Sequence, residues 1–304
     1  MWKVSKGENV LWILGNYGML PKGMVWRSRE VEARVAESQE ILYPGGTSIG
    51  ADVGLFKALT LIPAALKASR NPNGATLRDL LTPQAYEKWL VIRKKYLDDD
   101  KGVEKRRPIV ITEQLNNAVP GRGERGDSGV MWVVNNAANK HKVPIHRLPS
   151  IERKFDFGNI RKILKESRKL DFSEAACFTT NLDRIEPFVE AWKVGANAWA
   201  LGDIDTLRSA MKTPRLIDCS EVAMNGLRDG TVPDIAGARA TLERLDAETK
   251  SMQNEWQQTL LAAAETALAS NRSTFAVLDL DYVLAPEGFV KLMLDRGYTV
   301  EEPQ

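Results

Sequence analysis

The chain has 304 residues, of which 43% are hydrophobic and 27% are charged, and its 42 basic and 40 acidic side chains leave a formal net charge of +2. A chain of this size can bury a substantial core, and its balanced charge gives no reason to expect nucleic acid or an anionic membrane as the default partner. Two cysteines exclude a disulfide-rich scaffold, and two histidines limit any site that needs several imidazole ligands.

Strand patterns lie at both ends of the chain. An alternating segment at 2–5 and an apolar run at 10–14 predict a hairpin, since turn residues separate them. A helix is expected from Ser28 and a short strand over 40–43. Helical patterns then dominate, interrupted by an expected strand at 109–111. The expected closing elements are a strand over 274–280, a helix over 286–294 and a strand over 298–300.

This order of elements predicts an α/β fold. We expect a central mixed sheet built from the N- and C-terminal strands, covered by a mostly helical insert over roughly 70–270, in a single domain over 1–304. The most apolar stretch, 53–68, contains Lys57 and Pro63 and is shorter than the roughly 20 residues that span a bilayer, so no transmembrane segment is expected. The first residues also lack a secretory leader pattern, which fits a cytoplasmic protein or a mature exported chain.

Three segments resemble the TraB/GumN family, which includes the Tiki proteins. The segment LWILGNYGMLPKGM at 11–24, after Trp2-Lys3-Val4, resembles the family's opening strand and its G-x-x-H-x-L-P-x-G motif. The segment 275–282, followed by Pro286-Glu287-Gly288 and RGYTV at 296–300, is similar to the closing segment. WALGD at 199–203, followed by Leu207, resembles a signature from the family's middle. The resemblance therefore covers essentially the whole chain.

The resemblance implies a site for metal-dependent peptide hydrolysis, formed by two G-x-x-H histidines and acidic partners. Here Gly18 stands at the first histidine position, and Asp279 and Tyr282 replace the glycine and histidine of the second motif. Three further family positions also differ, at 42–45, 148–150 and 253–254. Glycine has no ligand atom, and a phenol with a pKa near ~10 is a poor ligand at neutral pH. The resemblance thus implies the family fold with lost or rewritten chemistry.

The expected cleft lies where the two end strands stop, because neighbouring parallel strands end at the same edge of a sheet. Of its residues, Asp279 and Asp281 are the metal candidates. Two carboxylates alone, however, underfill a Ca²⁺ shell of ~6–8 oxygens. No cofactor is expected. The candidate cleft residues are Gly15, Asn16, Tyr17, Gly18, Tyr43, Asp279, Asp281 and Tyr282.

Two functions remain open at this point. In the first, the protein has lost the metal site and binds a peptide, a saccharide or a protein partner through the old cleft. In the second, it is an active metal-dependent hydrolase with Asp279, Asp281, Glu40 and His146 as replacement ligands. An oligomeric structural role in an envelope assembly is neither supported nor excluded by the sequence. Because most of the family is exported, the resemblance also implies a periplasmic or secreted protein, and a cytoplasmic location stays open.

Other motifs favour structural roles. Val143-Pro144 separates His141 from His146, so the two histidines cannot share a helical face as a metal pair would. The G-x-G-x-x-G match at 121–126 does not follow its expected strand directly, which favours a surface loop over a dinucleotide site. Cys177 and Cys219 can bridge in an oxidising compartment or remain free thiols. Most tryptophans are expected in the core, although one or two of them, from a group that includes Trp12, Trp26 and Trp199, could line the cleft.

Overall fold

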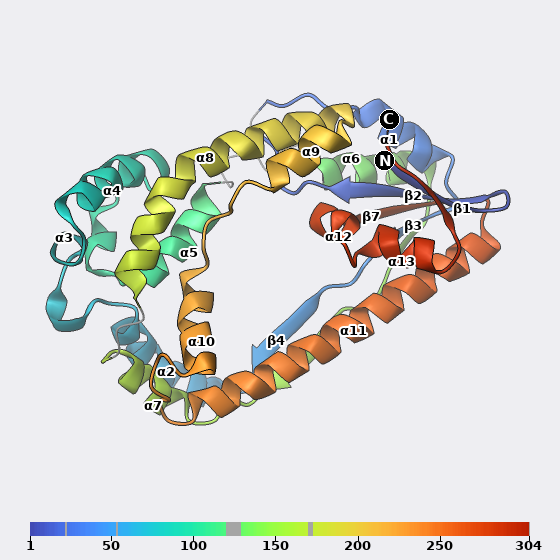
Figure 1. The fold of residues 1–304 in the computed structure, drawn as a ribbon. Coiled ribbons are helices and arrows are strands. Elements are labelled where there is room, and N and C mark those ends of the chain that lie inside the picture. Colours follow the sequence, from blue (N-terminus) through green and yellow to red (C-terminus); the bar gives the residue numbers. More distant parts are fainter. Residues whose placement is uncertain (22, 53, 120–128, 170–172, 304) are drawn as a thin grey trace.

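The fold is a mixed sheet at one end of the molecule with helices extending away from it (Figure 1). The structure is a computed structural model and describes residues 1–21, 23–52, 54–119, 129–169 and 173–303. The strands are β1 (Trp2–Lys6), β2 (Asn9–Asn16), β3 (Glu40–Tyr43), β4 (Thr47–Ala51), β5 (Ile145–Arg147), β6 (Ile151–Phe155), β7 (Ser273–Asp279) and β8 (Thr299–Glu301). The α-helices are α1 (Ser28–Ala36), α2 (Leu55–Ala68), α3 (Leu77–Leu80), α4 (Pro83–Tyr96), α5 (Pro108–Ala118), α6 (Val130–His141), α7 (Ile160–Ser167), α8 (Glu174–Leu201), α9 (Ile204–Met211), α10 (Cys219–Asp229), α11 (Ala238–Ser270), α12 (Leu280–Leu284) and α13 (Phe289–Asp295). Two short 3₁₀ helices are η1 (Pro72–Gly74) and η2 (Lys101–Lys105).

The main sheet has the strand order β5-β3-β7-β2-β1-β8. Its central pair, β2 and β7, is parallel and runs from Val10 opposite Ser273 to Asn16 opposite Asp279. β1 forms the expected hairpin with β2 and is also antiparallel to β8, so the sheet is mixed. The predicted α/β fold, with N- and C-terminal strands in one sheet and helices between them, is confirmed. β4 and β6 form a separate parallel pair.

The period-two pattern of the central strands produces a core on each face of the sheet. Leu11 and Ile13 of β2 point to the layer formed by α9, α11, α12 and α13, whereas Leu14 packs towards α1 and α6. In β7, Leu278 belongs to the first core, and Phe275 belongs to the second. Both faces are therefore covered, as expected for parallel strands that read as continuous apolar runs.

A third core lies away from the sheet, among α3, α4, α5 and the first half of α8. Its largest side chains, Trp89 and Phe178, meet edge to face with their ring centroids 5.4 Å apart. The long helices α8 and α11 run from the sheet to this helical end on different sides of the molecule (Figure 1). Helix α8 contributes side chains to this helical core and also to the core between the sheet and α11. It therefore fixes the helical end relative to the sheet.

Two local predictions were wrong. Residues 109–111 belong to α5 rather than to a strand, because Pro108 starts a helix in which Ile111 and Leu115, one turn apart, enter the helical core. The expected strand through Leu280 ends one residue earlier, and the chain turns directly into α12. Asp279 causes this turn, since its side chain accepts a hydrogen bond from the amide of Asp281 and caps the helix.

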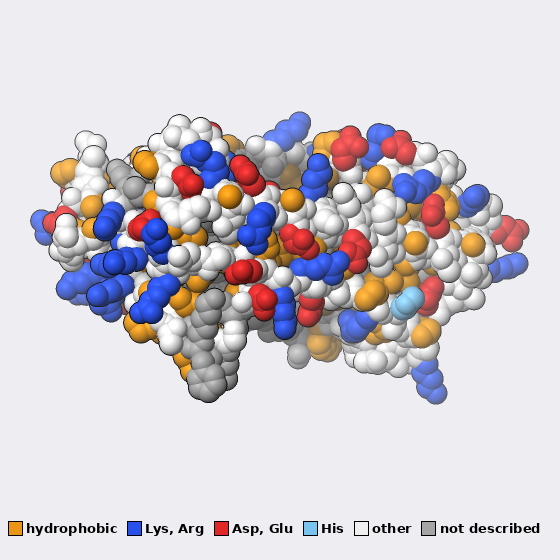
Figure 2. Space-filling view, turned by 90° about the horizontal axis from the view of Figure 1, so that it is seen from below, with side chains coloured by type: hydrophobic (Ala, Val, Ile, Leu, Met, Phe, Trp, Pro, Cys, Tyr) orange, Lys and Arg blue, Asp and Glu red, His pale blue; other side chains and the backbone are white. Residues whose placement is uncertain are grey.

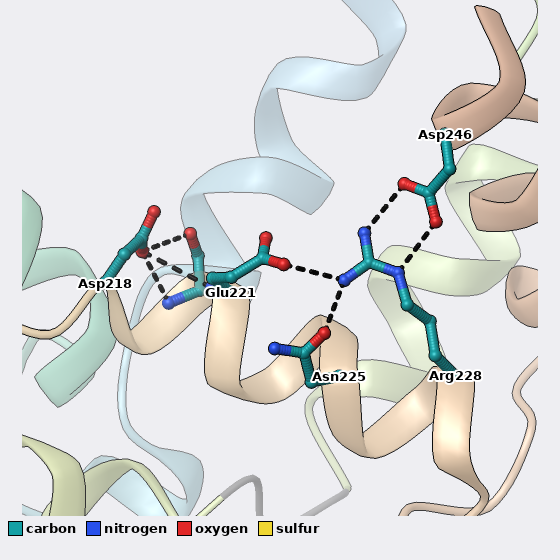
Figure 3. A network of polar contacts seen from close by, with 6 residues as sticks. Asp218, Glu221, Asn225, Arg228 and Asp246 are labelled. Atoms are coloured by element: carbon teal, nitrogen blue, oxygen red, sulfur yellow. Dashed lines mark hydrogen bonds and ion pairs between the residues drawn. The ribbon is translucent and has the colours of Figure 1, made fainter. Parts of the chain in front are cut away.

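Helix α10 is fixed on two sides. Cys219 at its start forms a disulfide with Cys177 of α8, with the two Cα atoms 5.9 Å apart. Near its end, Arg228 donates two hydrogen bonds of 2.8 Å to Asp246 of α11 and a third to Glu221 on its own helix (Figure 3). These contacts hold the segment between α9 and α10 in place. Among the helices that the structure describes, none combines the length and apolar character needed to cross a bilayer.

The disulfide yields a test of stability and of oxidation state. In denaturant, the untreated protein should resist alkylation and should gain two adducts by intact mass only after reduction. Changing Cys177→Ser together with Cys219→Ser should lower the free energy of unfolding by about 2–4 kcal/mol, because the unfolded chain loses a closed loop. Urea unfolding measures this difference, and two freely alkylated thiols in the untreated protein would contradict the bridge.

Candidate binding cleft

The central strand pair brings the expected site residues of the two chain ends together. In the parallel register Asn16 lies opposite Asp279, so the last residues of β2 and β7 are neighbours although they are far apart in sequence. Beyond β2 the chain continues through Tyr17, and beyond β7 it enters α12. In Figure 1 this edge of the sheet faces α8 and α9.

A cleft of about 280 Å³ opens at this edge. The strand ends and α12 supply its polar side, whereas α8, α9 and the chain after α9 supply a mainly apolar wall. Four of the eight expected residues line the cleft. The lining consists of Asn16, Tyr17, Met19, Phe188, Ala191, Trp192, Ala210, Met211, Thr213, Arg215, Asp279, Leu280 and Asp281.

Hydrogen bonds between α8 and the end of β2 shape the cleft. The Tyr17 hydroxyl donates to the carbonyl of Trp192 at 2.8 Å, and the Trp192 indole donates to the carbonyl of Met19 at 3.3 Å. Two turns further along α8, the Trp199 indole donates to the carbonyl of Gly15 at 2.6 Å. Together these bonds hold the segment that follows β2 against the helix.

Two glycines allow close packing around the end of β2. A Cβ on Gly15 would lie 2.7 Å from Leu280 Cδ1 and 2.9 Å from Trp2 Cζ3, so a side chain would force the strand away from its neighbours. A Cβ on Gly195 of α8 would lie 2.6 Å from the Tyr17 hydroxyl oxygen. Gly195 therefore lets the Tyr17 ring lie directly on α8, and Gly15 lets β2 pack closely against Leu280 and Trp2.

The polar side of the cleft has paired charges. Arg215 Nη2 lies 2.7 Å from both carboxylate oxygens of Asp281, and both side chains are largely exposed to solvent. Asp279 accepts the amide hydrogen of Asp281 at 2.9 Å. The two carboxylates and the guanidinium thus form a fixed arrangement of hydrogen-bond donors and acceptors at the cleft entrance.

The segment that carries Arg215 is held by the buried side chain of Asn181 on α8, which bonds to Ile217 two residues further on. The Asn181 amide donates to the carbonyl of Ile217 at 2.8 Å, and its oxygen accepts from the amide of Ile217 at 2.7 Å. These two hydrogen bonds fix a segment that has no regular secondary structure. The nearby disulfide at Cys219 fixes the same segment from its other end.

Burial changes the acidity of Tyr17. Removal from water disfavours the phenolate and raises the pKa of Tyr17 to about 12, with opposing effects from nearby Arg215 and Asp281. At neutral pH the hydroxyl is therefore protonated and remains the donor to Trp192. Tyr17 is therefore a neutral residue of the cleft wall, and it stays neutral to a higher pH than an ordinary tyrosine.

The other expected residues lie elsewhere. Gly15 is buried behind the cleft, and Gly18 is exposed with a left-handed φ of 87°. Tyr43 points to the opposite face of the sheet, where its hydroxyl donates to Asn135 of α6 at 3.4 Å. Tyr282 packs against Trp256 of α11, with ring centroids 4.9 Å apart. These four residues therefore do not line the cleft.

Neither histidine reaches the cleft. His141 ends α6 and is exposed, and His146 lies in β5, where its Nδ1 is 3.8 Å from Glu40 Oε2. Glu40 pairs with Thr274 at the opposite end of β7 from Asp279, about 17 Å away at ~3.3 Å per residue. The replacement ligand set of Asp279, Asp281, Glu40 and His146 is therefore not assembled.

The donor set at the strand ends does not suit the metal that the family resemblance implies. Gly18 offers no ligand atom, and both oxygens of Asp281 are bound by Arg215. Asp279 uses one oxygen to cap α12. Within the described ranges, no three His, Cys, Asp or Glu side chains are grouped as a metal site requires.

Sequence reasoning missed the apolar wall and its arginine. Trp192 and Phe188 lie in the part of α8 that precedes WALGD and carries no motif, and Arg215 lies in an irregular segment. No spacing therefore connects them to the strand ends. Trp12, Trp26 and Trp199 line a second hollow of about 320 Å³ behind Gly15. The G-x-G-x-x-G match at 121–126 lies outside the described residues.

The contact between α8 and β2 can be tested with Trp199→Phe. This change keeps an aromatic ring but removes the donor to the Gly15 carbonyl, which leaves a buried acceptor unpaired. We expect a loss of about 1–3 kcal/mol in the free energy of unfolding. The matched control is Trp132→Phe, at a position that is 48% exposed, for which we expect less than about 0.5 kcal/mol. Equal losses in urea unfolding would contradict a special role for this bond.

The raised pKa of Tyr17 predicts a pH-dependent contribution to stability. Between pH 10 and about 12 the unfolded chain ionises this phenol while the folded chain keeps it protonated, so the contribution is complete below pH 10 and is lost as pH rises towards 12. Tyr17→Phe should be less stable than the parent at pH 8, and this difference should shrink at pH 11. Urea unfolding at the two pH values measures it, and a constant difference would refute the shift.

Comparison with known proteins provides the family assignment. Neither the curated proteins nor the solved structures gave a significant match. The sequence profile described as the TraB/PrgY/gumN family matches residues 1–302, which is nearly the full length and includes both central strands and the cleft. The chain therefore belongs to the TraB/PrgY/gumN family.

Proposed function

We propose that this family member acts by binding, without the metal chemistry of its relatives, and that it holds a short peptide or an exposed protein segment in the cleft. The observation that carries this proposal is the composition of the cleft. An apolar wall faces the exposed ion pair between Arg215 and Asp281, beside the ends of β2 and β7.

The wall favours a peptide as the ligand. Met19 and Met211 supply flexible, polarisable surfaces, and Phe188 and Trp192 supply aromatic ones, a combination suited to an apolar side chain of variable shape. At the entrance, Arg215 can bind a carboxylate or a peptide carbonyl, and the Asp281 carboxylate can accept a peptide N–H. A saccharide would need more exposed hydrogen-bonding groups on the wall than a peptide does.

The ligand chemistry of the site supports loss of catalysis. Hydrolysis by the family mechanism needs a cation that activates water, and the residues at the strand ends are engaged with one another instead. Glu40 and His146, which the hydrolase alternative requires, lie near the other end of the strands. We therefore propose a catalytically degenerate protein.

We also propose a periplasmic or secreted location. The disulfide between Cys177 and Cys219 supports it, because such bridges persist in oxidising compartments and are rare in a reducing cytoplasm. Fractionation of expressing cells with rapid thiol trapping tests this part of the proposal. A protein that is found in the cytoplasm with both thiols reduced would contradict it.

Selection from a phage library of random peptides tests the binding proposal. We expect the enriched peptides to share an apolar side chain. Next to it they should carry either a carboxylate or main-chain N–H and C=O groups that are free to hydrogen-bond. Arg215→Ala removes one charged contact, and Ala191→Phe places a bulky ring in the cleft, so each should weaken peptide binding by about tenfold. Isothermal titration calorimetry with a synthetic form of the selected peptide measures this change.

The matched control is Arg272→Ala, which removes an 84%-exposed arginine at the other end of β7 and should leave peptide affinity unchanged. Enrichment that depends equally on Arg272 would argue against the cleft. Binding to a glycan array with no peptide enrichment would favour a saccharide. Chelator-sensitive cleavage of a peptide substrate would overturn the degenerate assignment.

A further inference from the structure

Helix α2 exposes an aliphatic stripe on the outside of the molecule. Leu59, Ile62 and Leu66 follow a spacing of three and four residues, which places them on one face, and they are 54%, 49% and 59% exposed. The half-buried side chains Leu61 and Ala64 lie on the opposite face, and α2 packs against α7. Thus α2 is apolar on both faces, and only one of them is covered.

The surroundings of this stripe are strongly basic. Between residues 54 and 70 the sequence has lysine and arginine but no acidic residue. Between 158 and 169, in and around α7, Glu166 is the single acidic residue. The basic residues of these two segments whose side chains the structure describes are Lys67, Arg70, Arg161, Lys162, Lys165, Arg168 and Lys169. The whole chain has a net charge of only +2, so positive charge is concentrated here.

Helix α7 presents its charges outwards. Ile163 packs towards the apolar cluster between α10 and α11, while Arg161, Lys162 and Lys165 are exposed. Figure 2 views the molecule from the side on which α2, α7 and α11 lie in Figure 1. Lys and Arg side chains gather there at the end of the molecule occupied by α2 and α7, next to hydrophobic side chains.

We propose that the surface formed by α2 and α7 docks on an anionic lipid bilayer. The three aliphatic side chains of α2 enter the headgroup region, and the lysines and arginines around them meet lipid phosphates. The 14 residues of α2 are too few to cross the bilayer, so the helix lies in the plane of the membrane surface. This inference rests on the α2–α7 surface and is independent of the peptide proposal.

Charge and side-chain type favour a membrane over a protein partner. Two copies of the chain meeting through this surface would bring like charges together, which opposes self-association. The exposed stripe is aliphatic, and its described side chains lack the tryptophan, tyrosine and arginine anchors that dominate protein interfaces. A surface with aliphatic side chains and a basic surround is typical of helices that bind the membrane interface.

Vesicle flotation tests the proposal with the full-length protein. The probes are vesicles of phosphatidylcholine alone and vesicles that also contain phosphatidylglycerol at about one part in three. We expect the protein to float with the anionic vesicles only, and to dissociate as salt is raised. The aliphatic variant combines Leu59→Ser, Ile62→Ser and Leu66→Ser, and the charge variant combines Arg161→Glu and Lys165→Glu. Each should reduce binding by about tenfold.

The control combines Val91→Ser with Leu201→Ser, which are 67% and 61% exposed on other helices, and it should float like the parent. Circular dichroism of each variant checks that the fold is retained. Failure of the parent to float with anionic vesicles would overturn the proposal, as would equal losses in the control. An oligomer of the parent that the aliphatic variant dissociates, without flotation, would identify a protein interface instead.

Discussion

The parallel pairing of β2 with β7 is the contact on which the rest of the structure depends. It joins segments from opposite ends of the chain, and the pairing from Val10 opposite Ser273 to Asn16 opposite Asp279 leaves both strand ends at one edge. The helical middle of the chain must therefore leave the sheet and return to it, which the long helices α8 and α11 accomplish. The cleft exists because α8 passes over that shared edge.

Hydrogen bonding explains why α8 stays at this position. The indoles of Trp192 and Trp199 and the hydroxyl of Tyr17 each combine a large apolar surface with one polar group, and each finds a backbone carbonyl. Packing alone would allow the helix to slide along the sheet, because apolar contact has little directional preference. The three directional bonds fix its register, and Gly195 has no side chain that would hold Tyr17 away from the helix.

The sequence predicted elements whose pattern is local and strong. The hairpin, the helix that begins at Ser28 and the strand β3 follow from alternation, turn residues and helical spacing. Tertiary packing decided the rest: the β-branched run at 109–111 is helical because Pro108 and the helical core select that state. The same limit applies to the cleft. Asn16 and Asp279 follow from strand pairing, but the irregular segment that carries Arg215 is placed by hydrogen bonds between Asn181 and Ile217.

Charge compensation explains how the strand ends remain stable without the family's ligands. Two carboxylates close together would repel each other, and a bound cation is one way to relieve that repulsion. In this chain Arg215 provides the positive charge for Asp281, and the helix start provides an amide for Asp279. A guanidinium attached to the chain cannot activate water as a metal does, but it can exchange one carboxylate partner for another. The charged groups of this exposed pair are therefore available to a ligand, as the proposed binding function requires.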